Sequence, residues 1–361
     1  MTASPVSIRD PRFTQVVGNR VEFERIATGC LFTEGPLWHP AGRYLLWSDM
    51  PGDHLRRWSA TDGVTTFRKP CNKSNGLTWD REGQLVACEH ASSQVSRTEA
   101  GGQIVPLATH FQGKQLNSPN DVVCSADGGI YFSDPPYGRA EFYGVPRPQE
   151  LAFQGLFRVG PDPKSPVLLA DDFDRPNGLC FSLDGRRLFV NDTARQHIRV
   201  FDVKGDGGLT GGKVWAATTG EGKGAPDGMK IDSKGHVYCT GPGGIHVFSP
   251  EAACLGVIHV PESVANFAWG DADYQSLYIT ASTSVYRIRV ATPGLPRYET
   301  MQSHLTEVVA CDDRKIRSRA LPYRSAESAV NGDPLKDIAV LQDRSRLSVM
   351  KGGRFVTRNL S

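Results

Sequence analysis

The chain has 361 residues, and its 41 Lys and Arg residues nearly balance its 39 Asp and Glu residues, for a formal net charge of +2. This balance lacks the clustered basic surface that nucleic-acid binding requires, and no run approaches the roughly eighteen apolar residues of a membrane-spanning helix. The opening MTASPVSIRDPRFTQVV lacks the apolar core of a signal peptide, and none of the eight cysteines forms a CxxC pair. We therefore expect a cytoplasmic protein with structural thiols and with neither nucleic acid nor a membrane as partner.

Six related phrases follow one another along the chain. Each has a short polar residue, an apolar run, a turn with Gly or Asp and a second apolar run. In chain order they are EGPLWHPAGRYLLWSD from Glu34, NGLTWDREGQLVACEH from Asn75, NDVVCSADGGIYFSD from Asn120, NGLCFSLDGRRLFVND from Asn177, DGMKIDSKGHVYCTG from Asp227 and NFAWGDADYQSLYITA from Asn266. Their starts lie 39 to 57 residues apart, which leaves room for two further strands in each unit.

Four strands in each unit of about 40–50 residues are typical of β-propellers. The third strands are expected at HLRRWS, QVSRT, GLFRVG, HIRVFDV, GIHVFSP and SVYRIRV. We therefore predict an all-β, six-bladed β-propeller over residues 13–296, because a β-sandwich would require six aligned repeats to be coincidental. Residues near 13–28 should complete the last blade, since closure of the ring hides exposed strand edges.

The first strand of each propeller blade lines the central channel, so the six opening residues should meet at one rim. These are Glu34, Asn75, Asn120, Asn177, Asp227 and Asn266. A hard divalent cation would satisfy several such oxygen-bearing side chains at once. The alternative is that asparagine merely begins strands as a turn residue.

Second-strand ends should return to the same face of the propeller. They would bring Asp49, His90, Asp134 and Asp192 towards the rim. For His90, a wall or substrate-contact role and no role at all both remain open. No GxSxG sequence occurs, so the chain offers no nucleophile motif of the serine-hydrolase type.

At FTEGPLW, LNSPNDVV, YFSDPPYG, RPNGLCFSLDG and PDGMKID the chain resembles the gluconolactonase, or regucalcin-like (senescence marker protein), family. The resemblance covers residues of about 30–290 and implies a six-bladed propeller that opens lactones with one catalytic divalent metal. It places the metal ligands at Glu34, Asn177 and Asp227, and it has Asn120 contact metal or substrate. The animal branch carries an arginine two residues before that asparagine, whereas this chain has Ser118. SDPPYG and the long spacing from Asn120 to Asn177 look more like the bacterial branch, with a loop over the channel mouth.

Lactone hydrolysis, the activity that the resemblance implies, passes through an oxyanion that a bound cation can stabilise. Asp227 is the candidate general base towards the attacking water, and Asn120, Asn75 and His90 are the candidate substrate-binding residues. Calcium suits an all-oxygen ligand set best, with zinc, magnesium, manganese and iron(II) left open. We expect a small-molecule lactone as substrate, sugar lactones such as gluconolactone first, and leave association into a homo-oligomer open.

Two alternative functions remain. One is hydrolysis of phosphotriesters or organophosphates at the same site, and the other is a non-catalytic propeller that binds proteins. A scaffold alone would not need an acid pair at the channel mouth, so the polar ring favours the enzyme.

The repeats stop near residue 297, and residues 297–361 form a C-terminal extension. Its segment DPLKDIAVLQDRSRLSVMKGGRFV, from Asp333, resembles the C-terminal end of metal-dependent amidohydrolases. The chain has no HxH pair, so that family's metal site and activity do not carry over. The extension is expected to be a β-hairpin or loosely ordered, and dispensable for the chemistry.

Overall fold

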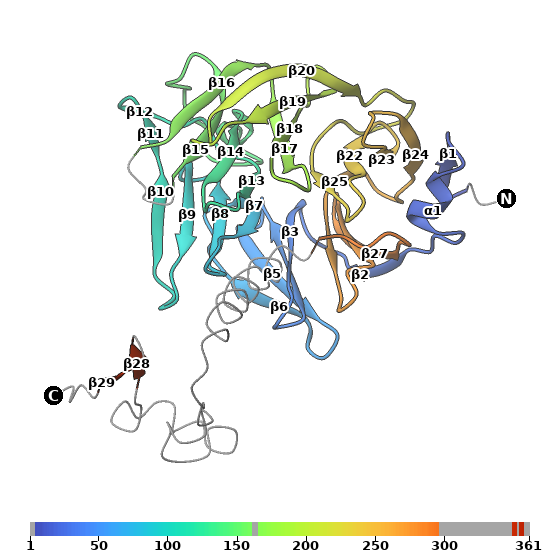
Figure 1. Cartoon of the computed structure of the whole chain (residues 1–361), viewed down its shortest axis with the longest axis horizontal. Helices are drawn as coiled ribbons and strands as arrows, with labels where there is room; N and C mark the ends of the chain where they lie inside the picture. Colours follow the sequence, from blue (N-terminus) through green and yellow to red (C-terminus); the bar gives the residue numbers. More distant parts are fainter. Residues whose placement is uncertain (1–3, 161–164, 296–348, 352–353, 357–361) are drawn as a thin grey trace. The chain divides into compact units, whose positions relative to one another are not determined.

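Six antiparallel sheets follow one another around a ring, with their first strands innermost (Figure 1). The computed structural model describes residues 4–160, 165–295, 349–351 and 354–356. Within the first of two compact units, residues 1–302, the first strand of each sheet contacts the first strand of the next, and the last of them, β25, contacts the first, β3. The predicted six-bladed β-propeller is therefore confirmed.

The strands of each blade run in chain order from the inner edge to the outer edge, except that the outermost strand of blades 5 and 6 comes from the N-terminal segment. Blades 1 to 3 consist of β3 (Thr33–His39), β4 (Tyr44–Asp49), β5 (His54–Ser59) and β6 (Gly63–Arg68); β7 (Ser74–Trp79), β8 (Leu85–Glu89), β9 (Gln94–Thr98) and β10 (Ile104–Ala108); and β13 (Val122–Cys124), β14 (Ile130–Asp134), β15 (Gln154–Val159) and β16 (Val167–Phe173). Blades 4 to 6 consist of β17 (Pro176–Phe181), β18 (Arg187–Asp192), β19 (His197–Val203) and β20 (Leu209–Ala217); β21 (Met229–Ile231), β22 (Val237–Gly241), β23 (Gly244–Phe248), β24 (Cys254–Ile258) and β1 (Val6–Ile8); and β25 (Val264–Gly270), β26 (Ser276–Ala281), β27 (Ser284–Arg289) and β2 (Glu24–Ala27). The six expected third strands are β5, β9, β15, β19, β23 and β27.

The repeated polar turn forms the hairpin between the first two strands of a blade. In blade 2, Asp80 Oδ1 accepts the backbone N–H of Glu82 at 3.0 Å, and Gly83 adopts a φ of +76°. Asp232 and Gly235, with a φ of +85°, repeat this arrangement in blade 5. An acceptor side chain and a residue that tolerates positive φ make a tight reversal, which explains why the phrase recurs.

Apolar side chains fill the spaces between neighbouring sheets. Between blades 2 and 3, Val86 and Cys88 share a buried cluster with Phe132 and Phe157, whose rings stack 5.5 Å apart. The described cysteines form no disulfide, and six of them are buried, as expected for small core residues. Among the described residues, no helix is long and apolar enough to cross a membrane.

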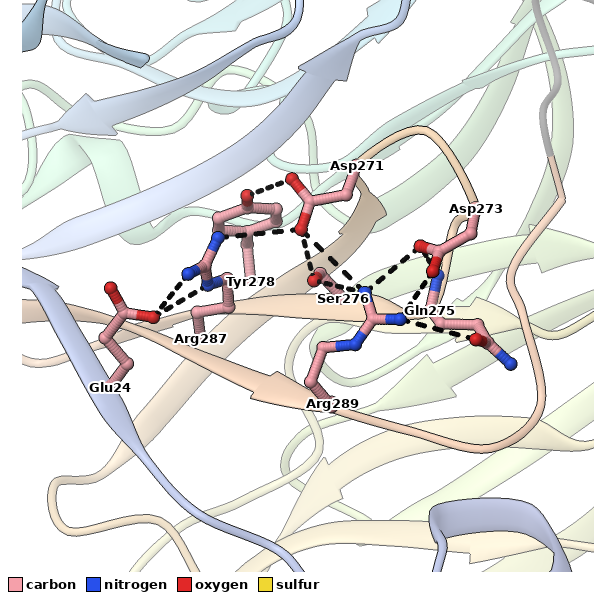
Figure 2. Close-up of polar contacts among 8 residues, drawn as sticks. All are labelled: Glu24, Asp271, Asp273, Gln275, Ser276, Tyr278, Arg287 and Arg289. Atoms are coloured by element: carbon pink, nitrogen blue, oxygen red, sulfur yellow. Dashed lines mark hydrogen bonds and ion pairs between the residues drawn. The ribbon is translucent and has the colours of Figure 1, made fainter. Parts of the chain in front are cut away.

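Ring closure uses the N-terminal segment, as predicted, but with fewer residues. Of residues 13–28, only β2 becomes a strand, and it pairs with β27 as the outer strand of blade 6. Figure 2 shows the polar network behind this pairing: Arg287 Nε donates to Glu24 at 2.9 Å, and the same guanidinium lies 3.6 Å from Asp271. Tyr278 donates to the other oxygen of Asp271 at 2.7 Å. The first and last parts of the propeller sequence are thus joined by backbone and side-chain bonds.

The residues before β2 form a helix and a strand that the repeats did not predict. Helix α1 (Phe13–Val17) packs Phe13, Val16 and Val17 into the same apolar cluster as the strands of blades 5 and 6. Strand β1 pairs with β24 and gives blade 5 a fifth strand. The N-terminal segment therefore contacts two blades, and not only the one that it closes.

Within the described residues, three further elements lie outside the blade strands. They are the hairpin of β11 (His110–Phe111) and β12 (Lys114–Gln115), the 3-10 helix η1 (Tyr137–Arg139), and the antiparallel pair of β28 (Val349–Lys351) and β29 (Arg354–Val356). The last pair belongs to the second unit, residues 303–361. Most of the predicted C-terminal extension lies outside the described residues.

Candidate active site

The six residues that open the repeats lie at equivalent places in the six blades. Four are in first strands, and Asn120 and Asp227 come just before β13 and β21. Five of them are at most 5% exposed, whereas Asp227 keeps a larger part of its surface. The ring predicted from the sequence therefore consists of five buried polar residues and the partly buried Asp227, and buried polar groups need partners or a ligand.

A glycine follows four of these residues because the backbone of the next blade passes there. A Cβ on Gly178 would lie 2.1 Å from the carbonyl oxygen of Asp227, and one on Gly76 would lie 2.6 Å from that of Asn120. The N–H groups of both glycines donate to those carbonyls, at 3.0 and 2.8 Å. Gly35 approaches Asn75, and Gly228 approaches Asn266, equally closely. The candidate site residues are thus held in place from blade to blade.

Glu34 and Asp227, from blades 1 and 5, meet at the centre of the site. Burial raises the pKa of Glu34 to about 7, although the N–H of Gly35 donates to its Oε2 at 2.6 Å. Burial, the charge of Glu34 and the charge of Asp121 raise the pKa of Asp227 well above its ordinary value. A hydrogen bond between the two carboxyl groups adds to this effect. The pair therefore holds a proton near neutral pH when no cation is present.

Asn177 lies beside this pair. Its side chain hydrogen-bonds the Asp227 carboxyl, and its Nδ2 donates to Thr193 Oγ1 at 3.2 Å. Thr193 in turn donates to the carbonyl of Pro226 at 2.6 Å. The structure thus brings together the three residues that the resemblance assigns as metal ligands.

Two charged residues of the site were missed by the sequence reasoning. Asp121 is almost fully buried and raises the pKa values of both Glu34 and Asp227 by its charge. Lys230, in β21, lies 3.6 Å from Asp121 Oδ2. Both residues are visible in the sequence, Asp121 in the dipeptide ND and Lys230 as the polar residue of MKI. An acid after an asparagine and a lysine in a strand are both common, however, so neither residue indicated a functional site.

The structure places His90 behind Asn75. Burial lowers the pKa of His90 to about 4, so the ring is neutral. Its Nδ1 lies 3.1 Å from the carbonyl of Tyr143, which can only accept, so Nε2 accepts from Asn75 Nδ2 at 3.2 Å. His90 is fully buried with both ring nitrogens engaged, and it orients an amide without presenting a nitrogen to the channel.

The acids at the second-strand ends do reach this face, but they bind backbone. Asp134 accepts the N–H groups of Asn117 and Ser118, both at 2.8 Å. Asp49 and Asp192 do the same for the segments before β3 and β17. In the three phrases that close on an aspartate, this residue therefore fixes the segment that leads into the first strand.

A loop between β14 and β15 runs beside the site. Its Tyr137 and Tyr143 lie close enough to Asp227 for that charge to raise their phenol pKa values, after the larger effect of burial. Ser118, which stands where the animal branch has arginine, donates to Pro135 O at 2.6 Å and accepts the N–H of Gly138 at 2.8 Å. The two hydrogen bonds of Ser118 therefore connect this loop to the segment before β13.

Two arginines of the loop and a lysine of a neighbouring segment also hold this loop in place. Arg147 donates to the carbonyl of His90 at 2.9 Å, and Lys73 Nζ lies 3.0 Å from the carbonyl of Gly144. Arg139 donates to the carbonyls of Asn117 and Leu116 at 2.8 and 2.6 Å. The predicted loop thus lies against blades 2 and 3 and reaches the charge of a blade 5 residue.

The donor chemistry of the site fits a hard divalent cation. In the described ranges, no three His, Cys, Asp or Glu side chains are grouped to bind a metal. A cation here would therefore need asparagine oxygens in addition to Glu34 and Asp227. Two buried carboxyl groups that share a proton, beside amide groups, are a set that such a cation could occupy in place of that proton.

The fold and the site together define a six-bladed propeller with paired acids and asparagines on its axis. Residues 32–283 match the family described as SMP-30/Gluconolactonase/LRE-like region. The chain belongs to this family, which confirms the resemblance seen in the sequence.

Individual relatives agree over most of the chain. A gluconolactonase of Zymomonas mobilis is 31% identical over 316 residues, which are 81% of this chain and 88% of that protein. A pentonolactonase of Haloferax volcanii is 27% identical over 302 residues, 76% of this chain and 96% of that protein. The solved structure of a gluconolactonase from Xanthomonas campestris is 31% identical, with a TM-score of 0.74, and the match covers 80% of this chain and 96% of that one.

Proposed function

We propose that this protein is a metal-dependent hydrolase that opens lactone rings, with sugar-acid lactones as the substrate class. The observation that carries the proposal is the buried pair of Glu34 and Asp227 on the propeller axis. The names of the relatives support the substrate class, because gluconolactones and pentonolactones are both cyclic esters of sugar acids.

Glu34, Asn177 and Asp227 would hold the cation, and calcium is our first choice because all the donors are oxygens. Zinc, magnesium, manganese and iron(II) are the alternatives that metal analysis would distinguish. When bound, a divalent cation supplies Lewis-acid polarisation of the ester carbonyl and charge stabilisation for the oxyanion.

The side chains of the chain would do the remaining work. Asp227 takes the proton of the attacking water, since it is the less buried residue of the two acids among the proposed ligands. Asn120 has its backbone fixed by Ser133, while its side-chain amide makes no hydrogen bond to any described residue and is available to the substrate. Asn75, oriented by His90, leaves its Oδ1 to accept from a substrate hydroxyl.

The proposal is tested by metal analysis of the purified protein and a panel of lactones with and without chelator. We expect one bound divalent cation, lactone hydrolysis that the chelator abolishes, and its recovery on adding metal back. Asp227→Ala should remove activity and leave the fold intact, whereas Asp271→Ala on blade 6 should leave turnover unchanged. Chelator-resistant turnover in Asp227→Ala would refute the mechanism.

The same panel separates the two alternative functions. A phosphotriester added to it would reveal that activity if the metal-loaded protein turned it over in preference to every lactone. Absence of turnover on all substrates, by protein that contains its metal, would favour a non-catalytic binding propeller.

A further inference from the structure

Lys230 brings a positive charge into the acidic site. It lies in β21, three residues after Asp227, and about a quarter of its side chain is exposed. Its Nζ lies 3.2 Å from Asn266 Oδ1 and 3.6 Å from Asp121 Oδ2. That Asp121 oxygen is buried and accepts no hydrogen bond from the described residues. The other oxygen, Oδ1, accepts the N–H of Val122 at 2.9 Å. A buried carboxylate without an opposite charge is costly, so Lys230 supplies the charge compensation for Asp121.

The contact with Asn266 passes the influence of Lys230 on to Glu34. Asn266 Oδ1 accepts from Lys230 and also from the N–H of Phe267 at 2.9 Å. Its Nδ2 is left to donate, and it does so to the Glu34 carboxyl, whose pKa this bond lowers against the larger effect of burial. Asn266 therefore supports Glu34 by a hydrogen bond, and its own Oδ1 is already occupied by Lys230 and the N–H of Phe267. The sequence had predicted that this oxygen would be available to a metal.

The position of Asn266 is fixed by its neighbour in blade 5. A Cβ on Gly228 would lie 2.2 Å from the Asn266 amide, so the amide packs directly on that glycine. The link from Lys230 through Asn266 to Glu34 consequently has little freedom to rearrange. Lys230 thus acts on Asp121 by direct contact and on Glu34 through this amide and by its own charge, while Asp227 interacts with Glu34 and Asp121.

We propose that Lys230 is a built-in counter-ion of the axial site. It holds the three acids together when no metal is bound, and it sets the affinity for a divalent cation below that which the acids alone would confer. The inference rests on the proposed function only in that the axial site binds a divalent cation. A fixed positive charge repels an incoming cation over several ångströms, and it stabilises the empty site by the same interaction.

The test compares calcium binding and thermal stability in the full-length wild type, Lys230→Met, Lys230→Arg and the double variant Lys230→Met/Asp121→Asn. Calorimetric titration with calcium chloride at pH 8 should show Lys230→Met binding at least about tenfold more tightly than wild type. In chelator its melting temperature should fall, and its gain on adding calcium should exceed that of wild type. Lys230→Arg keeps the charge and should stay close to wild type in both measurements.

The double variant removes one positive and one negative charge. It restores the net charge of the site, so its calcium affinity should return towards that of wild type. If Lys230→Met folds only with calcium while the double variant folds without it, the counter-ion role is supported. If neither variant folds under any condition, Lys230 is a packing residue and the proposal is overturned.

Two failures can be told apart. Wild-type protein that binds no divalent cation in the titration would refute the proposed function itself. Wild-type protein that binds calcium, together with Lys230→Met of equal or weaker affinity, would refute the inference about Lys230 and leave the proposed function standing.

Discussion

Replacing Glu34 by glutamine should stabilise the metal-free protein while destroying its metal site. The glutamine keeps the shape of the side chain and an acceptor oxygen for the N–H of Gly35. It removes a carboxyl group whose pKa burial raises from 4.5 to about 7. Between these two values the folded protein binds more protons than the unfolded chain, so the wild type loses stability as pH rises through this window.

The size of the effect follows from the same pKa change. Each tenfold change in proton affinity corresponds to about 1.4 kcal/mol, so ionised Glu34 costs the folded state on the order of 3 kcal/mol at pH 8. Glu34→Gln should recover up to this amount in urea unfolding with chelator present. Well below pH 4.5 the variant and the wild type should be equally stable, because Glu34 is then protonated in both states.

Calcium should reverse the order of stability. At about 1,000 times the dissociation constant a ligand adds about 4 kcal/mol to the wild type, and the variant should gain nothing. Glu262→Gln is the matched control. Burial raises the pKa of Glu262, but hydrogen bonds including those from the N–H of Thr283 and the hydroxyl of Tyr286 outweigh it and leave the pKa lowered. That variant should therefore lose stability at pH 8. A metal-free Glu34→Gln protein no more stable than wild type at pH 8, or one that calcium still stabilises, would refute the reasoning.

Three further predictions concern the same site and its surroundings. Asn120→Ala should lower turnover more than it lowers metal affinity, as steady-state kinetics and calorimetry would show; unchanged kinetics would assign Asn120 to a turn role. Gly178→Ala places a Cβ 2.1 Å from the Asp227 carbonyl and should cost about 1–3 kcal/mol of stability together with most of the activity, whereas Gly101→Ala, which has open space around it, should change neither. Truncation after Pro296 should keep specific activity but reduce solubility or change the oligomeric state in size-exclusion chromatography; a folded, metal-loaded truncate without activity would show that the extension takes part in the chemistry.

The repeats predicted the blades because each blade begins with a hairpin whose turn is determined by residues close together in the sequence. A turn such as that of Asp80 and Gly83 reverses the chain within a few residues, so the strand order can be read from spacing alone. The helix at Phe13–Val17 and the strand at Val6–Ile8 follow no such rule. They exist because blades 5 and 6 offer an apolar face and a free strand edge, and those become visible only in three dimensions.

The site was predictable where it depended on position in the repeat. Glu34 and Asp227 occupy equivalent places, so their meeting on the axis followed from the ring itself. Lys230 was not predictable, because its partners Asp121 and Asn266 come from blades 3 and 6. The orientation of His90 was not predictable either. The residue is at a repeat position, but the carbonyl of Tyr143 in the loop holds its ring towards the loop.

The close glycine contacts between blades divide the propeller into two arcs. They join blades 1, 2 and 3, and then blades 4, 5 and 6, through Gly35, Gly76, Gly178 and Gly228. In the other two blades Asp121 and Phe267 stand where these glycines stand, so the contact is not repeated across those two seams.

The proposed ligands are shared between the arcs, with Glu34 in one and Asn177 and Asp227 in the other. A cation at the axis would consequently bind side chains of both arcs and so link the two arcs to each other. Across the seam between blades 6 and 1, the N–H of Thr33 still donates to the carbonyl of Ser282 at 2.8 Å. Local opening, measured by amide hydrogen exchange, should therefore concentrate where blade 3 meets blade 4, and bound metal should slow exchange there.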